Sequence, residues 1–229
     1  MMSVLKFRVE GGSPFEVQPS RLVVAGWTGR DTAAVEHHIE ELAAIGVPRP
    51  SSVPLYYRLT RSLLTQVHAL EMLGTASSGE AEPVLVRHAG RWWLTVGSDH
   101  TDRAAEVHSV AVSKQMCAKP LASSAWAWDE VAARADTITL RSEIYEGEHW
   151  VTYQQGPMAG LRPLQSLIDG LPADVPVAEG LVLFCGTLAA VPRKDGVAIR
   201  PAERMRVELL DGNRHIKHEY SVKSLPMVV

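Results

Sequence analysis

The stretch SSGEAEPVLV, residues 77–86, decides how the larger part of the chain is organised. It reads as the start of a β-strand, because a small polar segment leads into the apolar run Val84–Val86. Residues i and i+2 of a strand share a face, so Glu80 and Glu82 are expected to project together. Two adjacent carboxylates repel each other unless positive charge lies between them. A hard divalent cation, which prefers oxygen ligands, would supply that charge.

A third acid follows in the segment LTVGSDHTDR, residues 94–103. Asp99 comes at the end of a second apolar, strand-like run, and Ser98, His100 and Arg103 lie beside it. An E-x-E pair alone is common on solvated strand edges, and an aspartate at a strand end often accepts hydrogen bonds from backbone donors. The three acids together favour a metal site over these surface interpretations.

The composition is that of an ordinary globular protein. Of 229 residues, 46% are hydrophobic and 21% are charged. The net charge of −3 argues against a nucleic-acid or acidic-membrane partner, since proteins that bind these usually carry a basic excess. No run approaches the roughly 18–20 apolar residues of a membrane-spanning helix, and the segment MMSVLKFRVEGG lacks a signal-peptide core. We therefore expect a cytoplasmic protein that binds neither nucleic acid nor membranes.

The cysteines exclude some kinds of metal site. Cys117 and Cys185 lie far apart in apolar surroundings and are expected to be buried, reduced thiols. The sequence contains no CxxC motif and no Cys/His cluster, so zinc and iron–sulfur sites are not expected.

The first part of the chain predicts a small α/β lobe. Alternating apolar residues predict a strand over Leu5–Val9, and RLVVAGW (Arg21–Trp27) predicts another. Asp31 is placed to cap a helix, which Gly46 and Pro48 would end. Within that helix, apolar residues form one face and acidic residues another, namely Val35, Ile39, Leu42 and Ala43 against Glu36, Glu40 and Glu41.

From Ser77 onward, short strands separated by turn signals dominate the sequence. The expected strands are Pro83–Arg87, Trp92–Val96, Thr137–Ile144, Trp150–Tyr153, Leu181–Cys185, Met205–Leu209 and His215–Val222. Helices are expected over Trp126–Ala135 and Pro163–Leu171. There is no regular βαβ alternation, which disfavours a doubly wound fold. The pattern indicates an α+β protein: a lobe over residues 1–76, then a mixed β-sheet roll over 77–229, with the two packing separately or as one compact unit.

The order of four motifs resembles that of the fumarylacetoacetate hydrolase superfamily. These motifs are GEAEPVLV, TVGSDHTDR, VSKQMCAKPLASSAW and LVLFCGTLAAV, and the resemblance covers about two thirds of the chain from Ser77 onward. It implies that family's β-roll, a divalent metal (Mg²⁺ or Mn²⁺, with Ca²⁺ as a third option) and a homodimer.

The resemblance also implies roles for particular residues. Glu80, Glu82 and Asp99 match the metal ligands, and Arg103 matches an arginine four residues after the ligand aspartate. Lys114 matches a lysine that contacts substrate, with Lys119 as its rival. The G-T turn, Gly186 and Thr187, matches a substrate-binding turn. The run PLYYRLT, with Tyr57 and Arg58, is the nearest match to a segment that in the family ends in a catalytic histidine.

The sequence departs from the family pattern in ways that bear on activity. Only 17 positions separate Asp99 from Glu82, where the family usually inserts a short helix, so a plain hairpin is expected. Leu188 stands where the family has proline. No histidine follows PLYYRLT, so the motif does not identify the residue that would act as the base for water. His100 is the first candidate, and His37, His38 and His68 are others.

The activity that the resemblance implies is cleavage of a C–C bond in a 2-oxo or β-diketo acid, by hydrolysis or decarboxylation. A metal acts there as a Lewis acid that stabilises an enolate, while Lys114 and Arg103 hold the carboxylate or the developing oxyanion. Two alternatives stay open: an isomerase or hydratase that uses the same metal site, and a relative that binds a small acid without catalysis.

Overall fold

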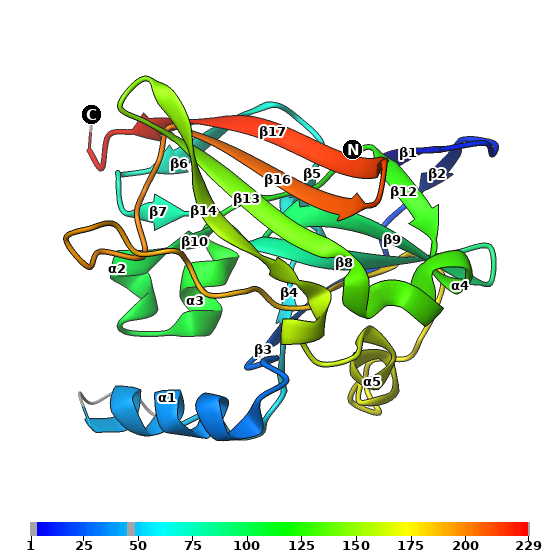
Figure 1. Ribbon diagram of the computed structural model, residues 1–229, viewed down its shortest axis with the longest axis horizontal. Helices are drawn as coiled ribbons and strands as arrows, with labels where there is room; N and C mark the ends of the chain where they lie inside the picture. The colour runs from blue at the N-terminus through cyan, green and yellow to red at the C-terminus, as the bar shows by residue number, and fades with distance from the viewer. Residues whose placement is uncertain (1–3, 45–48, 229) are drawn as a thin grey trace.

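The computed structural model describes residues 4–44 and 49–228, and its strands form two large mixed sheets (Figure 1). The larger sheet has the strand order β2-β1-β12-β9-β8-β15-β3-β4. In that order, its strands are Phe15–Val17, Leu5–Val9, Ser124–Ala127, Arg91–Ser98, Ala81–His88, Leu181–Phe184, Arg21–Gly26 and Leu55–Leu59. The smaller sheet, β14-β13-β16-β17-β6, comprises His149–Pro157, Thr139–Glu146, Arg204–Asp211, Arg214–Leu225 and Ala69–Leu73. The α+β class is therefore confirmed.

Two short strand pairs and several helices complete the fold. The pairs are β10 (Thr101–Asp102) with β7 (Ser77–Ser78), and β11 (Lys119–Pro120) with β5 (Leu64–Thr65). The α-helices are α1 (Thr32–Ala44), α2 (Arg103–Glu106), α3 (Val110–Gln115), α4 (Trp128–Val131) and α5 (Leu164–Asp169). The 3-10 helices are η1 (Arg61–Leu63), η2 (Ala132–Thr137) and η3 (Met158–Gly160). No helix in the described part of the chain is long and apolar enough to span a membrane.

Both faces of the larger sheet are buried at its central strands, because side chains of one strand alternate between two apolar cores. On β8, Leu85 packs into the core shared with the smaller sheet, and Val84 and Val86 pack into a second core on the opposite face. The polar ends of the central strands, rather than their middles, are therefore the places where functional groups can lie.

Strands from both sides of residue 76 share both large sheets. β3 pairs with β15 in parallel from Arg21–Leu181 to Val24–Phe184, and β6 pairs with β17. The division of the chain at residue 76, with the two parts packed separately or as one compact unit, stays a prediction.

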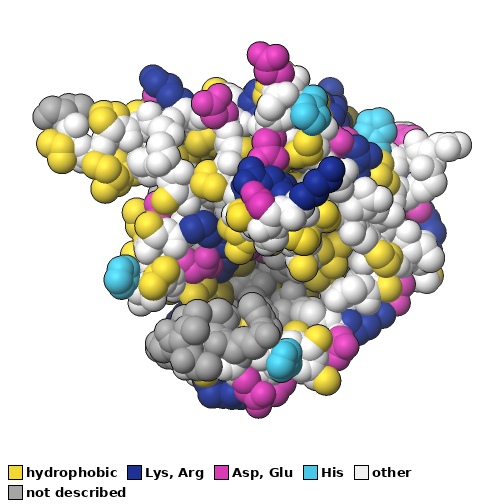
Figure 2. All heavy atoms as spheres, turned by 60° about the vertical axis from the view of Figure 1, so that its left-hand side comes forward, with side chains coloured by type: hydrophobic (Ala, Val, Ile, Leu, Met, Phe, Trp, Pro, Cys, Tyr) yellow, Lys and Arg dark blue, Asp and Glu magenta, His cyan; other side chains and the backbone are white. Residues whose placement is uncertain are grey.

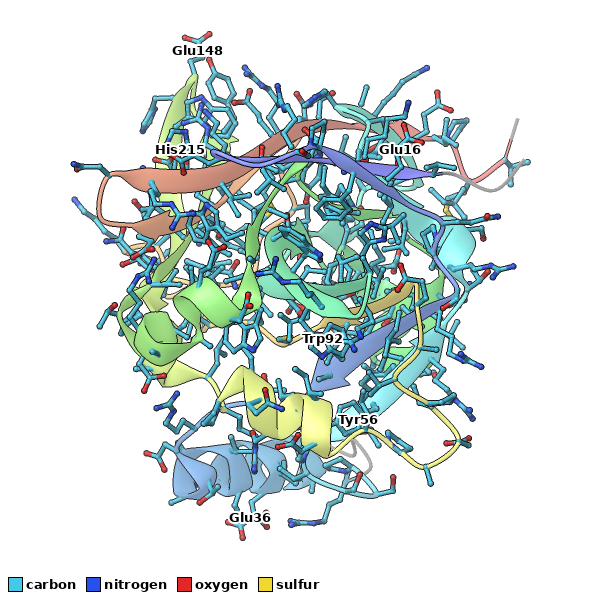
Figure 3. All side chains as sticks on the ribbon, turned by 90° about the vertical axis from the view of Figure 1, so that its right-hand side faces the viewer. Glu16, Glu36, Tyr56, Trp92, Glu148 and His215 are labelled. Atoms are coloured by element: carbon cyan, nitrogen blue, oxygen red, sulfur yellow. The ribbon has the colours of Figure 1, made fainter. Side chains whose placement is uncertain are left out.

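Helix α1 begins where the sequence predicts. The Asp31 carboxylate accepts hydrogen bonds from the backbone N–H groups of Ala33 and Ala34 at 3.0 and 3.1 Å. Glu36 points away from the rest of the molecule (Figure 3). Gly46 and Pro48, which were expected to end the helix, lie outside the described residues.

The predicted helix over Trp126–Ala135 was wrong at its start. Trp126 and Ala127 belong to β12 and pair with Leu94 and Trp93 of β9, so the helical segment begins only at Trp128. The sheet offers both residues cross-strand partners on β9, which outweighs their helical spacing.

A buried histidine on β17 makes the fold sensitive to acid. His218 is 3% exposed, stacks on His68 at 4.9 Å and donates from Nε2 to the Val67 carbonyl at 3.2 Å. Burial, with a further effect of His68, lowers the pKa of His218 from 6.5 to about 4. Between pH 6.5 and 4, His218 binds a proton in the unfolded chain but not in the folded chain. The stability that depends on His218 is therefore full above pH 6.5 and is lost as the pH falls toward 4.

We therefore expect His218→Gln to weaken the pH dependence of stability. Each histidine of this kind costs about 1.4 kcal/mol of unfolding free energy per pH unit in that window, or about 2 kcal/mol between pH 6.5 and 5. Urea unfolding at these two pH values measures the difference. The loss should shrink by that amount in His218→Gln and stay unchanged in His149→Gln, a control at the exposed β13–β14 turn. Equal losses in the wild-type protein, His218→Gln and His149→Gln would contradict the assignment of this acid sensitivity to His218.

Candidate metal centre

The β8–β9 hairpin brings the three sequence-predicted acids together. Ala89 and Gly90 turn the chain with positive φ values of 50° and 72°, so Ala81 lies opposite Ser98, and Glu82 lies opposite Gly97. The backbone N–H of Asp99 then donates to the Glu80 carbonyl at 2.9 Å. One carboxylate oxygen from each of Glu80, Glu82 and Asp99 lies within 4.8 Å of the others. The plain hairpin expected between Glu82 and Asp99 is confirmed.

Three basic side chains surround this acid cluster. Lys114 Nζ on α3 contacts Asp99 Oδ2 and lies 3.7 Å from Glu80 Oε2. Lys119 Nζ lies 3.1 Å from the other Asp99 oxygen and also donates to the carbonyls of His100 and Lys114. Arg103 bridges Glu80 at 3.1 Å and Glu106 at 2.8 Å. The rivals Lys114 and Lys119 therefore both reach Asp99, from opposite sides of its carboxylate.

Short caps hold these cations in place. The Asp102 carboxylate accepts from Ala105 N at the start of α2, and the Ser109 hydroxyl accepts from Val112 N at the start of α3. Thus α2 carries Arg103 and α3 carries Lys114 over the acid cluster. The side of the molecule with α1, α2 and α3 is hollowed, and side chains of both charges border the hollow (Figure 2).

Burial and close charges shift the pKa values of the cluster in different directions. Burial acts to raise the pKa of Asp99, but Lys114 and Lys119 lower it to about 2. Burial, followed by the neighbouring Asp99, raises the pKa of Glu82 well above its ordinary range. Burial acts to lower the pKa of Lys114, but Asp99, Glu80 and Glu82 hold it above the ordinary value. Lys114 is therefore a fixed cation, and Glu82 is the carboxylate that most lacks a positive partner.

These groups fit a hard divalent cation. The fully buried Asp99 Oδ1 has no hydrogen-bond partner in the described structure, although Lys119 lies 3.1 Å away. Three carboxylates can supply oxygen ligands from one side, which leaves the remaining positions for water or an oxygen-bearing substrate. A cation there would also supply the positive charge that Glu82 lacks.

The Gly186–Thr187 turn closes the cluster from a third strand. Strand β15 ends beside the start of β8, and Gly186 N donates to Glu82 Oε2 at 2.8 Å. The Thr187 hydroxyl donates to the Ala81 carbonyl at 2.7 Å and accepts from Gln154 Nε2 at 2.7 Å. The turn thus orients Glu82, and the Thr187 hydroxyl is held by the protein itself.

Gly186 is expected to tolerate no side chain. Its φ is +90°, and an added Cβ would lie 1.6 Å from Thr28 Oγ1. We expect Gly186→Ala to lose about 3 kcal/mol or more of unfolding free energy, measured by urea denaturation. Gly212→Ala is the matched control, because its φ is +60° with open space around it, so it should lose only about 1 kcal/mol. Equal losses would mean that the contact with Thr28 contributes nothing.

His100 does not face the acid cluster. Its ring is 1% exposed, its Nδ1 lies 3.1 Å from the Tyr220 hydroxyl, and its Nε2 lies 3.0 Å from Ser77 Oγ. Burial, and then the nearby Lys119 and Arg103, lower the pKa of His100 to about 3. With both ring nitrogens engaged, the expectation that His100 activates water finds no support in the structure.

Tyr57 and Arg58 lie on opposite sides of β4, as alternation requires. The Tyr57 ring centroid lies 5.9 Å from Lys114 Nζ, at the edge of the acid cluster. Arg58 is exposed and pairs with Asp174 at 2.6 Å, so the structure does not bring it to the site and its predicted substrate role is not supported. The neighbouring Tyr56 shares the side of Arg58 and donates to the Leu167 carbonyl in α5 (Figure 3). Among the other candidate bases, His68 stacks on His218, and the side chain of His38 lies outside the described residues.

Gln154 is a residue of the site that no sequence pattern indicates. Its amide oxygen accepts from Ala81 N at 2.9 Å and from Ser142 Oγ at 2.8 Å, and its amide nitrogen donates to Thr187. One buried glutamine therefore ties β8, β13 and the Gly186–Thr187 turn together. Its place depends on the packing of the two sheets, which local sequence does not encode.

Comparison with known families gives one match over most of the chain. A family model described as "Protein of unknown function (DUF2848)" matches residues 25–220. Among curated proteins, none matches the sequence.

Several solved structures share the fold at low sequence identity. For 2-keto-3-deoxy-D-arabinonate dehydratase in its apo form, the TM-score is 0.65 at 17% identity over 90% of this chain and 74% of that chain. For the complex of a 2-keto-3-deoxy-D-arabinonate dehydratase with magnesium and 2,5-dioxopentanoate, the TM-score is 0.64 at 16% identity over 91% of this chain and 74% of that chain.

Two further solved structures extend the comparison. The fumarylacetoacetate hydrolase from psychrophilic Exiguobacterium antarcticum gives a TM-score of 0.59 at 13% identity over 90% of this chain and 76% of that one. A probable 2-hydroxyhepta-2,4-diene-1,7-dioate isomerase from Mycobacterium abscessus gives a TM-score of 0.58 at 12% identity over 90% of this chain and 76% of that one. The fold is therefore that of the fumarylacetoacetate hydrolase superfamily, as the motif order implies.

Proposed function

This chain belongs to the family described as "Protein of unknown function (DUF2848)", and we propose that it is a metal-dependent enzyme that acts on a 2-oxo acid. The observation that carries the proposal is the acid cluster, with its carboxylate oxygens within 4.8 Å of one another. Structures with the same fold are named as a dehydratase, an isomerase and a hydrolase, and one holds magnesium with 2,5-dioxopentanoate.

In this proposal Glu80, Glu82 and Asp99 hold a Mg²⁺ or Mn²⁺ ion. Such an ion would act as a Lewis acid that draws negative charge onto the 2-oxo oxygen. Gly186 N–H keeps Glu82 in place, and Lys114 and Lys119 fix the orientation of Asp99. Lys114 and Arg103, held as cations, bind the carboxylate or the developing oxyanion.

The charges around the site favour an anionic substrate. The cluster acids Glu80, Glu82 and Asp99 are balanced by Arg103, Lys114 and Lys119, and Glu106 adds one further negative charge. A divalent cation therefore leaves an excess of positive charge in a largely buried place. Such an excess is best neutralised by a ligand that carries a carboxylate.

The reaction we favour needs no activated water. Hydrolysis of a C–C bond requires a base for water, and the first candidate for that base, His100, is turned toward Tyr220 and Ser77. Of the two cleavage reactions implied by the motifs, decarboxylation is therefore favoured over hydrolysis. Isomerisation or hydration of a 2-oxo acid is the second candidate, because it uses the same cation and the same fixed Lys114.

Titration of the chelator-treated protein tests the proposal. Mn²⁺ should bind, and oxalate, which mimics an enolate of a 2-oxo acid, should strengthen its binding. Mn²⁺-dependent loss of oxaloacetate beyond the rate of Mn²⁺ alone would then indicate decarboxylation, with acetylpyruvate as the probe for hydrolysis. Absence of Mn²⁺ binding would reject the enzyme assignment, and binding without turnover of any 2-oxo acid would favour the non-catalytic relative.

The homodimer and the cytoplasmic location stay predictions. Light scattering would measure whether the protein is a homodimer.

A further inference from the structure

Trp27, directly after β3, has a backbone conformation that is unfavourable for its side chain. Its φ is 59°, in the left-handed region, and it is one of three non-glycine residues with positive φ in the described chain, with Ala89 and Glu148. The other two lie in hairpin turns, where this conformation is common. A bulky aromatic residue adopts it rarely, and such outliers gather at functional sites.

The neighbouring residues hold Trp27 in this conformation. The carbonyl of Thr28 accepts a hydrogen bond from Arg162 N at 2.7 Å, and Arg30 N donates to the Gly160 carbonyl at 3.0 Å. The Thr28 side chain packs against Gly186, where an added Cβ would collide with it. The strained residue is therefore fixed to the turn that orients Glu82.

The positive φ changes the side of the sheet that Trp27 faces. Along β3, Val23 and Ala25 pack into the core shared with the smaller sheet, whereas Val24 packs into the opposite core. Regular alternation would place Trp27 with Ala25. Instead, the Trp27 side chain lies within hydrogen-bonding reach of Tyr57, where it acts against the rise that burial causes in the pKa of Tyr57. The Tyr57 ring packs on the same side as Val24. The conformation thus turns the indole toward the side that carries the acid cluster.

Tyr57 connects this indole to the acid cluster. Its ring centroid lies 5.9 Å from Lys114 Nζ, within the range of a cation–π contact, and Lys114 contacts Asp99. Both aromatic side chains are only half-buried, so each keeps surface that a ligand can cover. They therefore present an aromatic wall next to the place where a 2-oxo acid would lie.

We propose that Trp27 determines specificity, and that the substrate is a 2-oxo acid with an aromatic or large apolar group that packs on Trp27 and Tyr57. This inference rests on the proposed function, since the acid cluster must first bind the oxo-acid end through a metal ion. Trp27 touches the substrate body in this arrangement and not the reacting atoms. It should therefore affect which acid binds and leave the binding of oxalate unchanged.

Titration calorimetry with Mn²⁺ and three ligands tests the inference. Oxalate probes the oxo-acid end alone, and 2-oxobutanoate and 2-oxo-4-phenylbutanoate differ by one phenyl ring. We expect the phenyl compound to bind about tenfold or more tightly than 2-oxobutanoate, because its ring is buried against the aromatic wall. In Trp27→Gly, this preference should fall below about twofold, with oxalate affinity unchanged.

Control variants separate ligand contact from altered backbone strain. Trp27→Gly and Ala89→Gly both introduce the residue that favours positive φ, and Ala89 lies exposed at the far end of the β8–β9 hairpin. Both should raise or preserve the melting temperature, but only Trp27→Gly should lose the preference for the phenyl compound. Trp27→Phe, which keeps a ring, should retain most of that preference. If Trp27→Gly fails to fold, Trp27→Asn takes its place, because asparagine tolerates positive φ but has no ring, and it should lose the preference in the same way.

The possible failures can be told apart. If oxalate does not bind with Mn²⁺, the proposed function fails, and this inference fails with it. If oxalate binds but the phenyl compound has no advantage, or keeps its advantage in Trp27→Gly, only the specificity inference is overturned.

Discussion

Replacement of Glu82 by glutamine is expected to remove metal binding while the fold survives. Glu82 is 2% exposed, and its Oε2 accepts from Gly186 N at 2.8 Å, a contact that the glutamine carbonyl can also make. The substitution removes one of three ligand carboxylates, so the affinity for Mn²⁺ should fall on the order of 100-fold or more. Because burial and Asp99 already raise the pKa of Glu82, a neutral side chain at this position should cost little stability.

The matched control is Glu106→Gln, which makes the same chemical change beside the cluster. Glu106 pairs with Arg103 at 2.8 Å but does not belong to the acid cluster. If the effect of Glu82→Gln comes from ligation, Glu106→Gln should change the Mn²⁺ affinity only a few-fold. Titration calorimetry of both variants measures this, with thermal melts to compare their stability. Wild-type affinity for Mn²⁺ in Glu82→Gln would contradict the assignment of Glu82 as a metal ligand.

The strands were predictable because their signals are local. Apolar runs bounded by Gly90, Gly147 and Asp211-Gly212 became the hairpins β8–β9, β13–β14 and β16–β17. Trp126 shows the limit, because its helical spacing was overridden by pairing with Leu94, a partner 32 positions earlier. The joining of β3 to β15 and of β6 to β17 depends on contacts even farther apart along the chain.

The acid cluster was partly predictable from strand geometry. The spacing of Glu80 and Glu82 placed them on one face, and a plain hairpin brought Asp99 beside them. The same alternation separates Tyr57 from Arg58, so only one of these neighbours could reach the site. It was the tyrosine, because Arg58 points to Asp174. His100 follows Asp99 directly and likewise turns away from the cluster.

Trp27 and Gln154 could not be recognised from the sequence. The role of Trp27 depends on a positive φ imposed by neighbours such as Arg162 and Gly160, which are more than 100 positions away. Gln154 matters because two sheets meet at its amide group. Neither feature is marked by a hydrophobic period or by a motif spacing in the sequence.

Replacement of Asp99 by asparagine should have the largest effect on stability. Asp99 and Lys119 are both 0% exposed, and Asp99 also contacts Lys114. Among the described residues, loss of its charge leaves Lys119 with only the carbonyls of His100 and Lys114 as hydrogen-bond partners. Breaking one side of a buried ion pair typically costs about 3–5 kcal/mol, and we expect a loss of that size in urea unfolding at pH 7. A loss below about 1 kcal/mol would show that the pair is not buried as described.

A double-mutant cycle can separate unpaired charge from altered packing. In the Asp99→Asn background, Lys119→Met removes the cation that lost its partner, so it should restore stability, whereas alone it should destabilise. The pH dependence gives a second, independent readout. Burial lowers the pKa of Lys119, and without Asp99 nothing comparable opposes that effect, so the folded variant releases this proton more readily than the unfolded chain. Stability of Asp99→Asn should therefore recover as the pH rises from 7 to 9, whereas a packing defect would leave the loss unchanged.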